Sequence, residues 1–208
     1  MAVTGIVFLL FLIAHMIGNL KIFLGKAEYN NYAAWLRTMG SPAVPANWGL
    51  GILSVILGVC VAAHIGSAVE LALRARRARP VRYYGGRPKQ GYASRTMRTG
   101  AILVALFIVY HLLDLTFRVA NPKGILGDPY DNVVADFHNP LVTAFYVISL
   151  LVLGLHIRHG AWSALQTLGR SNARRQRGIN IFAIVFSVLL IGGFLAVPFG
   201  VVIGVVHS

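Results

Sequence analysis

Acidic residues and cysteine are scarce in this sequence. Six Asp and Glu stand against 19 Lys and Arg, and charged residues make up only 12% of the chain. Soluble domains contain about 25% charged residues, so this composition disfavours a soluble globular protein. The single cysteine, Cys60, excludes an internal disulfide, a Cys-x-x-Cys redox pair and an iron–sulfur cluster held by four cysteines. Any redox chemistry in this chain would therefore need a cofactor held by other residues.

The residues after Met1 also lack the basic segment and small-residue cleavage site of a signal peptide, so the first apolar stretch is expected to stay in the mature protein. Apolar residues make up 57% of the chain. An α-helix needs about 20 of them to cross a bilayer, and lipid offers the backbone no alternative hydrogen bonds. The sequence predicts an all-α, multi-pass integral membrane protein, a single domain over residues 1–208 with five transmembrane helices. Their approximate spans are 2–24, 48–73, 99–119, 139–165 and 178–206.

Basic residues concentrate in two of the connecting loops. Nine of them lie between Arg74 and Arg98, and the loop after the fourth span carries Arg170, Arg174, Arg175 and Arg177. The positive-inside rule places these loops in the cytoplasm, the amino terminus inside and the carboxyl terminus outside, in the cytoplasmic membrane. The basic excess therefore marks loops that flank the membrane, where it can contact lipid headgroups or an acidic partner, and nucleic acid is not an expected partner.

Four of the seven histidines lie inside the first four predicted spans, one in each: His15, His64, His111 and His156. An ionisable residue inside a membrane indicates a functional site. Counted from the outer ends of the spans, His15 and His111 lie 10 and 9 residues deep, whereas His64 and His156 both lie 16 residues deep. At 1.5 Å per residue these depths are ~14–15 Å and ~24 Å. Two histidines therefore share each of two levels.

Two imidazoles from different helices at one level meet the requirement for bis-histidine ligation of a haem iron. The pattern predicts two b-type haems, an outer one held by His15 and His111 and an inner one held by His64 and His156. Two alternatives stay open. The histidines could hydrogen-bond across helices without a metal, or they could bind zinc or copper, although a zinc site needs four ligands at one depth.

Several short segments resemble the di-haem cytochrome b membrane anchor of succinate dehydrogenase and fumarate reductase, the succinate:quinone oxidoreductases. The segments, in chain order, are His15-Met-Ile-Gly-Asn19, Tyr92-Ala-Ser-Arg-Thr-Met97, Val109-Tyr-His-Leu-Leu113, Phe137-His-Asn-Pro140 and His156-Ile-Arg-His-Gly160. In this family the first four helices supply the haem ligands, and the first helix pairs with the third and the second with the fourth. The resemblance therefore implies the same four histidines in the same two pairs.

The resemblance also implies partners and a reaction. A flavoprotein subunit and an iron–sulfur subunit would dock on the cytoplasmic loops and carry out the succinate or fumarate chemistry of the tricarboxylic acid cycle. This chain would be the non-catalytic subunit, which passes electrons between them and a quinone, with menaquinone expected. The assembled complex could form higher oligomers.

Further candidates lie around the two levels. Residues that could contact haem propionates or quinone, or simply extend to the membrane surface, are Arg74, Arg95, Arg98, Arg158 and His159. Helical spacing predicts ion pairs between Asp114 and Arg118 and between Glu70 and Arg74, and Asp114 could instead carry protons. A quinone could bind at the inner face or at the outer face, near Asn19, Lys21, Glu28 and Tyr32.

Two other functions remain as alternatives at this stage. The chain could be the cytochrome b subunit of another respiratory oxidoreductase, of the hydrogenase or formate dehydrogenase type. It could also be a non-redox transporter or scaffold whose histidines bind protons or metal.

Overall fold

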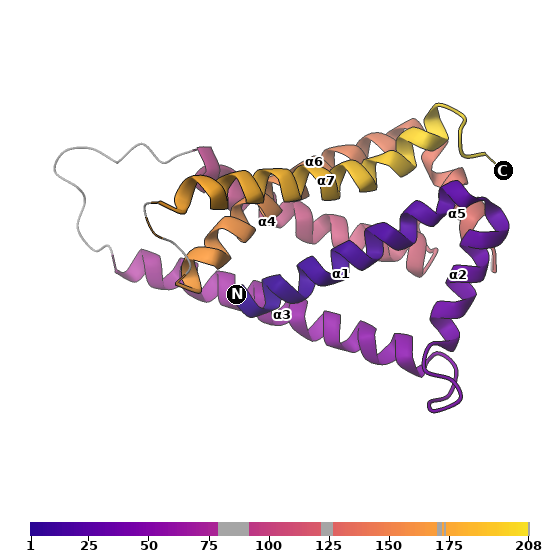
Figure 1. Cartoon of the computed structure of the whole chain (residues 1–208), viewed down its shortest axis with the longest axis horizontal. Coiled ribbons are helices and arrows are strands. Elements are labelled where there is room, and N and C mark those ends of the chain that lie inside the picture. The colour runs from indigo at the N-terminus through magenta and orange to yellow at the C-terminus, as the bar shows by residue number, and fades with distance from the viewer. Residues whose placement is uncertain (79–91, 122–126, 170–171, 173, 208) are drawn as a thin grey trace.

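The chain folds as an elongated bundle of helices. A computed structural model describes residues 1–78, 92–121, 127–169, 172 and 174–207, and these residues contain helices and no strand. Five helical segments within them are long and apolar enough to cross a membrane, which confirms the predicted five spans. The long helices run along the length of the molecule, while two shorter helices, α2 and α5, lie together at one end (Figure 1).

The helical bounds follow the apolar stretches closely. The first span is α1 (Ala2–Leu20), continued by the 3₁₀ turn η1 (Lys21–Leu24). The second, fourth and fifth spans are α3 (Trp48–Arg77), α6 (Pro140–Thr167) and α7 (Gln176–Val202). The third span is α4 (Tyr92–His111), which passes directly into a π-helical turn, η2 (Leu112–Thr116).

Two spans end earlier than the sequence predicts. The third stops at Thr116 rather than residue 119, and Arg118 has a left-handed backbone with φ 58°. The fifth stops at Val202 rather than residue 206, because Gly204 adopts φ 77° and reverses the chain. The amide of Val206 then donates to the Gly200 carbonyl at 3.0 Å, and the Val206 side chain is buried. Hydropathy alone does not detect these turns because the apolar residues continue beyond them.

The two connecting segments at the end opposite the basic loops each contain a helix, which lies outside the predicted membrane spans. Helix α2 (Lys26–Thr38) follows Gly25, whose φ of 98° favours glycine. Helix α5 (Pro129–Phe137) begins at Asp128, whose carboxylate accepts from the Asp131 amide at 3.2 Å. Asp at the N-cap followed by proline is a strong start signal for a short helix.

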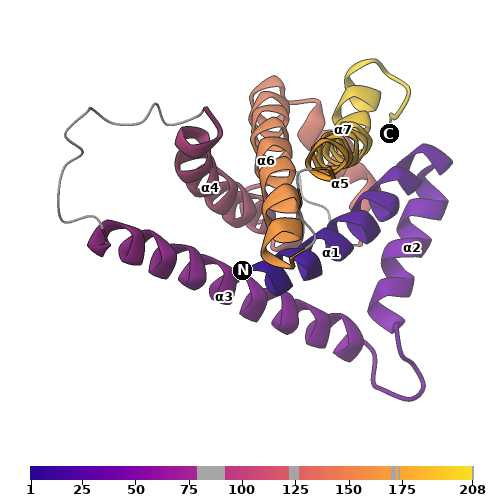
Figure 2. The same ribbon diagram turned by 60° about the vertical axis from the view of Figure 1, so that its left-hand side comes forward.

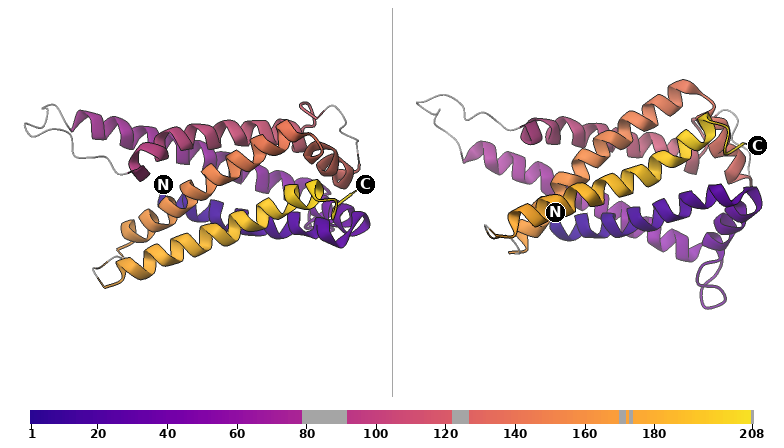
Figure 3. Two further views of the ribbon diagram at one scale, coloured as in Figure 1. Left: turned by 90° about the horizontal axis from the view of Figure 1, so that it is seen from above. Right: turned by 45° about the horizontal axis from the view of Figure 1, so that its top comes forward.

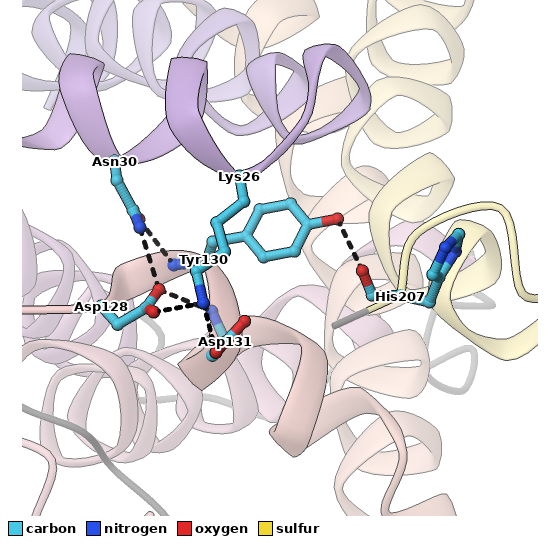
Figure 4. A network of polar contacts seen from close by, with 6 residues as sticks. All are labelled: Lys26, Asn30, Asp128, Tyr130, Asp131 and His207. Atoms are coloured by element: carbon cyan, nitrogen blue, oxygen red, sulfur yellow. Dashed lines mark hydrogen bonds and ion pairs between the residues drawn. The ribbon is translucent and has the colours of Figure 1, made fainter.

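A polar network joins α2 to α5 (Figure 4). The Lys26 ammonium lies 2.6 Å from a carboxylate oxygen of Asp128 and 2.6 Å from one of Asp131. The Asn30 amide donates to Asp128 at 2.9 Å and accepts from the Tyr130 backbone amide at 3.0 Å. Burial alone would raise the pKa of Asp128, but the hydrogen bonds from Lys26 and Asn30 and from the α5 backbone hold it at about 2. The network therefore fixes the two short helices to each other.

The core lies mainly on α6 and α7, which pack against each other and lie next to each other in both views of Figure 3. Gly154 of α6 permits this close approach, because a Cβ there would lie 2.9 Å from Cγ1 of Ile191. Helix α1 packs on the same pair, whereas α3 diverges from it and has no buried residue (Figure 2). Most of the contacts of α3 with the rest of the bundle are to α1 and α2, and the ring of His64 also meets His156 of α6.

Candidate functional site

The first histidine pair joins α1 to the end of α4. The ring centroids of His15 and His111 lie 5.8 Å apart, with an angle of 82° between the ring planes. Phe11 stacks on His15 at 5.2 Å, and Phe194 of α7 lies 5.8 Å from the same ring. Aromatic residues therefore hold His15 in an apolar environment beside His111.

The second pair joins α3 to α6. The ring centroids of His64 and His156 lie 6.4 Å apart, with an interplanar angle of 60°. Phe8 of α1 contacts the His64 ring edge-on at 5.5 Å. These two histidines are 92 residues apart in the chain, and the crossing of α3 with the bundle brings them together.

The two pairs lie at different levels of the bundle. His64 contacts Phe8, whereas His111 contacts His15, seven residues further along α1. Seven residues of helix correspond to a separation of about 10 Å. The structure thus brings together the same two combinations of histidines that the depth of each residue in the sequence predicts.

One histidine of each pair has a hydroxyl partner at Nδ1. Oγ1 of Thr4 lies 2.9 Å from Nδ1 of His64 and donates to the Met1 carbonyl. The Tyr146 hydroxyl lies 3.4 Å from Nδ1 of His111 and donates to Asp114 at 2.7 Å. Each hydroxyl proton is directed to another acceptor, so the hydroxyl oxygen accepts from Nδ1–H. Nε2 of both histidines is then unprotonated and available to a metal.

This donor set fits axial ligation of two iron centres. Two imidazoles on opposite sides of one metal have ring centroids roughly 6 Å apart, because each nitrogen–metal bond is about 2 Å long. The separations of 5.8 and 6.4 Å agree with this value. In addition, Nδ1 of His156 is buried and has no hydrogen-bond partner among the described residues. Among the residues that the structure describes, no three or more His, Cys, Asp or Glu side chains come together as a metal site.

Small residues near the histidines differ in what surrounds them. A Cβ at Gly160, four residues after His156, would meet nothing within 4 Å, which leaves space on the ligand face of α6. The space beside Gly18, three residues after His15, is instead filled by Tyr32, because a Cβ at Gly18 would lie 2.6 Å from the Tyr32 hydroxyl. Gly160 is thus compatible with a flat cofactor, and Gly18 accommodates Tyr32.

The predicted ion pair between Asp114 and Arg118 is wrong. Asp114 lies in the π turn and accepts from Tyr146, and Arg118 has already left the helix. The i,i+4 spacing that would bring the two side chains together requires regular α-helix, which this segment does not form. The predicted pair between Glu70 and Arg74 is confirmed, with 2.7 Å between the two groups.

The structure does not bring the other basic candidates together at the histidine pairs. Arg74 is exposed and bound to Glu70, and Arg158 is exposed on α6. His159 packs against Trp162, with ring centroids 5.8 Å apart. The side chains of Arg95 and Arg98 lie outside the described part of the structure.

A cavity of about 150 Å³ lies next to His15, at the end of the bundle that carries α2 and α5. Its lining residues are His15, Gly18, Asn19, Tyr29, Tyr32, Ala33, Leu36 and Pro129. A cavity of this volume accommodates one aromatic ring. Burial raises the pKa of Tyr29 to about 12, so its hydroxyl stays protonated and able to donate. Asn19 and Tyr32 were among the candidates for an outer quinone site, whereas the exposed Glu28 is not in the lining.

Two residues of the site were missed at the sequence level. Thr4 could have been found, because it lies eleven residues before His15, almost exactly three helical turns, on the face of α1 that carries the histidine. Tyr146 gives no comparable signal, since its contact with His111 depends on how α6 packs against α4.

The family model described as succinate dehydrogenase/fumarate reductase transmembrane subunit matches residues 72–195. This range includes one histidine of each pair, His111 and His156. No curated protein and no solved structure matches the chain significantly.

Proposed function

Because the chain belongs to the succinate dehydrogenase/fumarate reductase transmembrane subunit family, we propose that it carries electrons through two b-type haems between an iron–sulfur subunit and a membrane quinone. The observation that carries this proposal is the arrangement of four intramembrane histidines as two pairs at two levels. A chain of two redox centres about 10 Å apart along the bundle would connect its two ends.

His15 with His111 would hold one haem, and His64 with His156 would hold the other. The iron supplies the one-electron chemistry, and the protein supplies the ligands and their surroundings. Thr4 and Tyr146 would fix the rings of His64 and His111 through Nδ1, which leaves Nε2 of each ring for the iron. Of the basic candidates, His159 follows His156 by three residues on the same face of α6 and would be the one to interact with a propionate there, whereas Arg158 is exposed on another face.

The basic end of the bundle is the proposed docking surface for the flavoprotein and iron–sulfur subunits. The carboxyl end of α3 and the amino end of α7 both lie there, away from α2 and α5 (Figure 1). The last turn of α3 contains Arg74, Arg76 and Arg77. The positive-inside rule then places this end and the amino terminus in the cytoplasm, with the chain in the cytoplasmic membrane and the carboxyl terminus outside.

Menaquinone is the expected quinone, and we assign the oxygen-bearing ring of its bicyclic headgroup to the cavity beside His15, which has room for one ring. Its walls are mostly apolar, and Asn19, Tyr29 and Tyr32 provide groups that can hydrogen-bond quinone oxygens. Because His15 lines the cavity, a quinone there would lie next to the ligand of the nearer haem.

The direct test is a reduced-minus-oxidised spectrum of the purified full-length protein, with haem quantified per polypeptide. We expect two b-type haems, with one lost in His15→Ala and the other in His64→Ala. The matched control is His207→Ala, which changes an exposed histidine outside both pairs and should retain both haems. Copurification with a flavoprotein and an iron–sulfur protein tests the partners. Folded protein without haem would refute the electron-transfer pathway.

A further inference from the structure

A buried polar bridge connects the π turn, α6 and the end of α4. Asp114 of η2 is 1% exposed and Tyr146 of α6 is 4% exposed, and the hydroxyl of Tyr146 donates to Oδ2 of Asp114 at 2.7 Å. The same hydroxyl oxygen lies 3.4 Å from Nδ1 of His111. Three side chains from two membrane-spanning segments therefore form a continuous chain from a carboxylate to an imidazole.

Resting on the proposed function, we propose that Asp114 and Tyr146 are positioning residues for the haem held by His15 and His111, and that they tune its redox equilibrium through His111. The tyrosine proton is committed to the carboxylate, so the hydroxyl oxygen accepts from Nδ1–H of His111. This hydrogen bond fixes the tautomer and the orientation of the ring. It also increases electron density on the imidazole, which strengthens the ligand and favours ferric over ferrous iron.

Packing alone does not explain a carboxylate at this position. Placing a carboxylate inside an apolar bundle is unfavourable, and an apolar side chain would fill the same space without that cost. Oδ1 of Asp114 is buried and has no partner among the described residues, so Tyr146 provides the hydrogen bond shown for this group. The π turn begins immediately after His111, and such turns are frequent at functional sites.

A second buried carboxylate, that of Asp136, is affected by the charge of Asp114. Asp136 of α5 is 5% exposed, and burial together with the charge of Asp114 raises the pKa of Asp136 to about 7. Asp114 of η2 therefore interacts with Asp136 of α5 through its charge and with Tyr146 through a hydrogen bond.

The test is a redox titration of the full-length, haem-loaded protein with Tyr146→Phe and Asp114→Asn. Tyr110→Phe is the matched control, because this ring packs against Tyr146 at 6.0 Å and loses the same hydroxyl oxygen, while the hydrogen bonds between Asp114, Tyr146 and His111 do not involve it. In Tyr146→Phe, both haems should be retained. At a fixed ambient potential, the reduced-to-oxidised ratio of the haem absent from His15→Ala should rise on the order of 5–10-fold, the effect of about one hydrogen bond.

The remaining variants and the second haem make the result specific. Asp114→Asn keeps an acceptor and removes the charge, so its shift should have the same direction and be smaller. The haem held by His64 and His156 is the internal reference and should not change. The ferric electron paramagnetic resonance signal of the His15–His111 haem should also move in Tyr146→Phe, since the ring of His111 is no longer held.

Three outcomes would overturn the inference. They are retained haem with an unchanged ratio in Tyr146→Phe, an equal shift in Tyr110→Phe, and an equal shift of both haems. If Tyr146→Phe loses the haem, the reduced-to-oxidised ratio is measured in Asp114→Asn, which leaves every ring in place. An unchanged ratio in that variant would overturn the inference. A wild-type protein without haem would instead refute the proposed function, which separates the two failures.

Discussion

The hydroxyl of Thr4 lies 2.9 Å from Nδ1 of His64 and connects the first turn of α1 to the middle of α3. This contact matters for the position of His64, because α3 has no buried residue along its length. Tyr146 provides the equivalent hydroxyl for His111 in the other pair. In each pair, one histidine is therefore oriented by a hydroxyl from a neighbouring helix, and its Nε2 is directed away from that helix contact.

We predict that Thr4→Val weakens haem binding by His64 and His156. Valine has nearly the same shape but cannot accept from Nδ1–H, and loss of such a partner costs roughly 10-fold in metal affinity. The measurement is a haem titration monitored by absorbance, in which Thr4→Ser should behave like the wild type. Thr38→Val is the control, since Thr38 is exposed and its hydroxyl bonds the Trp35 carbonyl. Equal affinity in Thr4→Val and the wild type would contradict the prediction.

How much of the site the sequence predicts depends on the physical origin of each feature. The histidine pairing follows from depth, because a membrane helix has a fixed rise per residue and limited freedom to tilt. The contact between Tyr146 and His111 depends on the rotation of α6 against α4, which apolar periodicity does not specify in a helix exposed to lipid. The pairing of Asp114 with Tyr146 rather than Arg118 depends on a π turn, whose register no residue pattern here indicates.

The packing of Gly18 against Tyr32 makes a second prediction, which tests the proposed quinone cavity. A Cβ at Gly18 would displace the Tyr32 ring, which lines that cavity. We expect Gly18→Ala to raise the KM for a soluble quinone several-fold while both haems are retained. Gly58→Ala is the control, because the same change on α3 meets nothing within 4 Å. Unchanged quinone kinetics in Gly18→Ala would place the quinone elsewhere.

The network between α2 and α5 predicts a loss of stability in acid. The pKa of Asp128 is about 2 in the folded protein and near 3.9 in an unfolded chain, so its stabilising effect is complete above about pH 4. It disappears as the pH falls from about 4 to 2. Asp128→Asn should lower the Tm in detergent at pH 6 by a few degrees, and the gap to the wild type should close by about pH 2. A gap that is constant over this range would show that the carboxylate charge is not the cause.

Asp136 predicts a pH dependence of the opposite sign. Its pKa is raised to about 7 by burial and by Asp114, whereas an unfolded aspartate titrates near 3.9. Between these values the folded protein binds more protons than the unfolded chain, so stability decreases as the pH rises from about 4 to about 7. Asp136→Asn removes this dependence. We therefore expect its Tm to approach that of the wild type near pH 4 and to exceed it by several degrees at pH 8, where each kcal/mol corresponds to roughly 2–4 °C.

The comparison between Asp136→Asn and Asp128→Asn provides the control for that measurement. Both variants remove one aspartate charge at the same end of the bundle, so a general effect of net charge would move both curves in parallel. A local effect makes the two differences from the wild type arise in separate pH ranges and with opposite signs. Parallel curves for the two variants would contradict the assignment of a raised pKa to Asp136, because only a group that keeps its proton up to about pH 7 destabilises the fold above that pH.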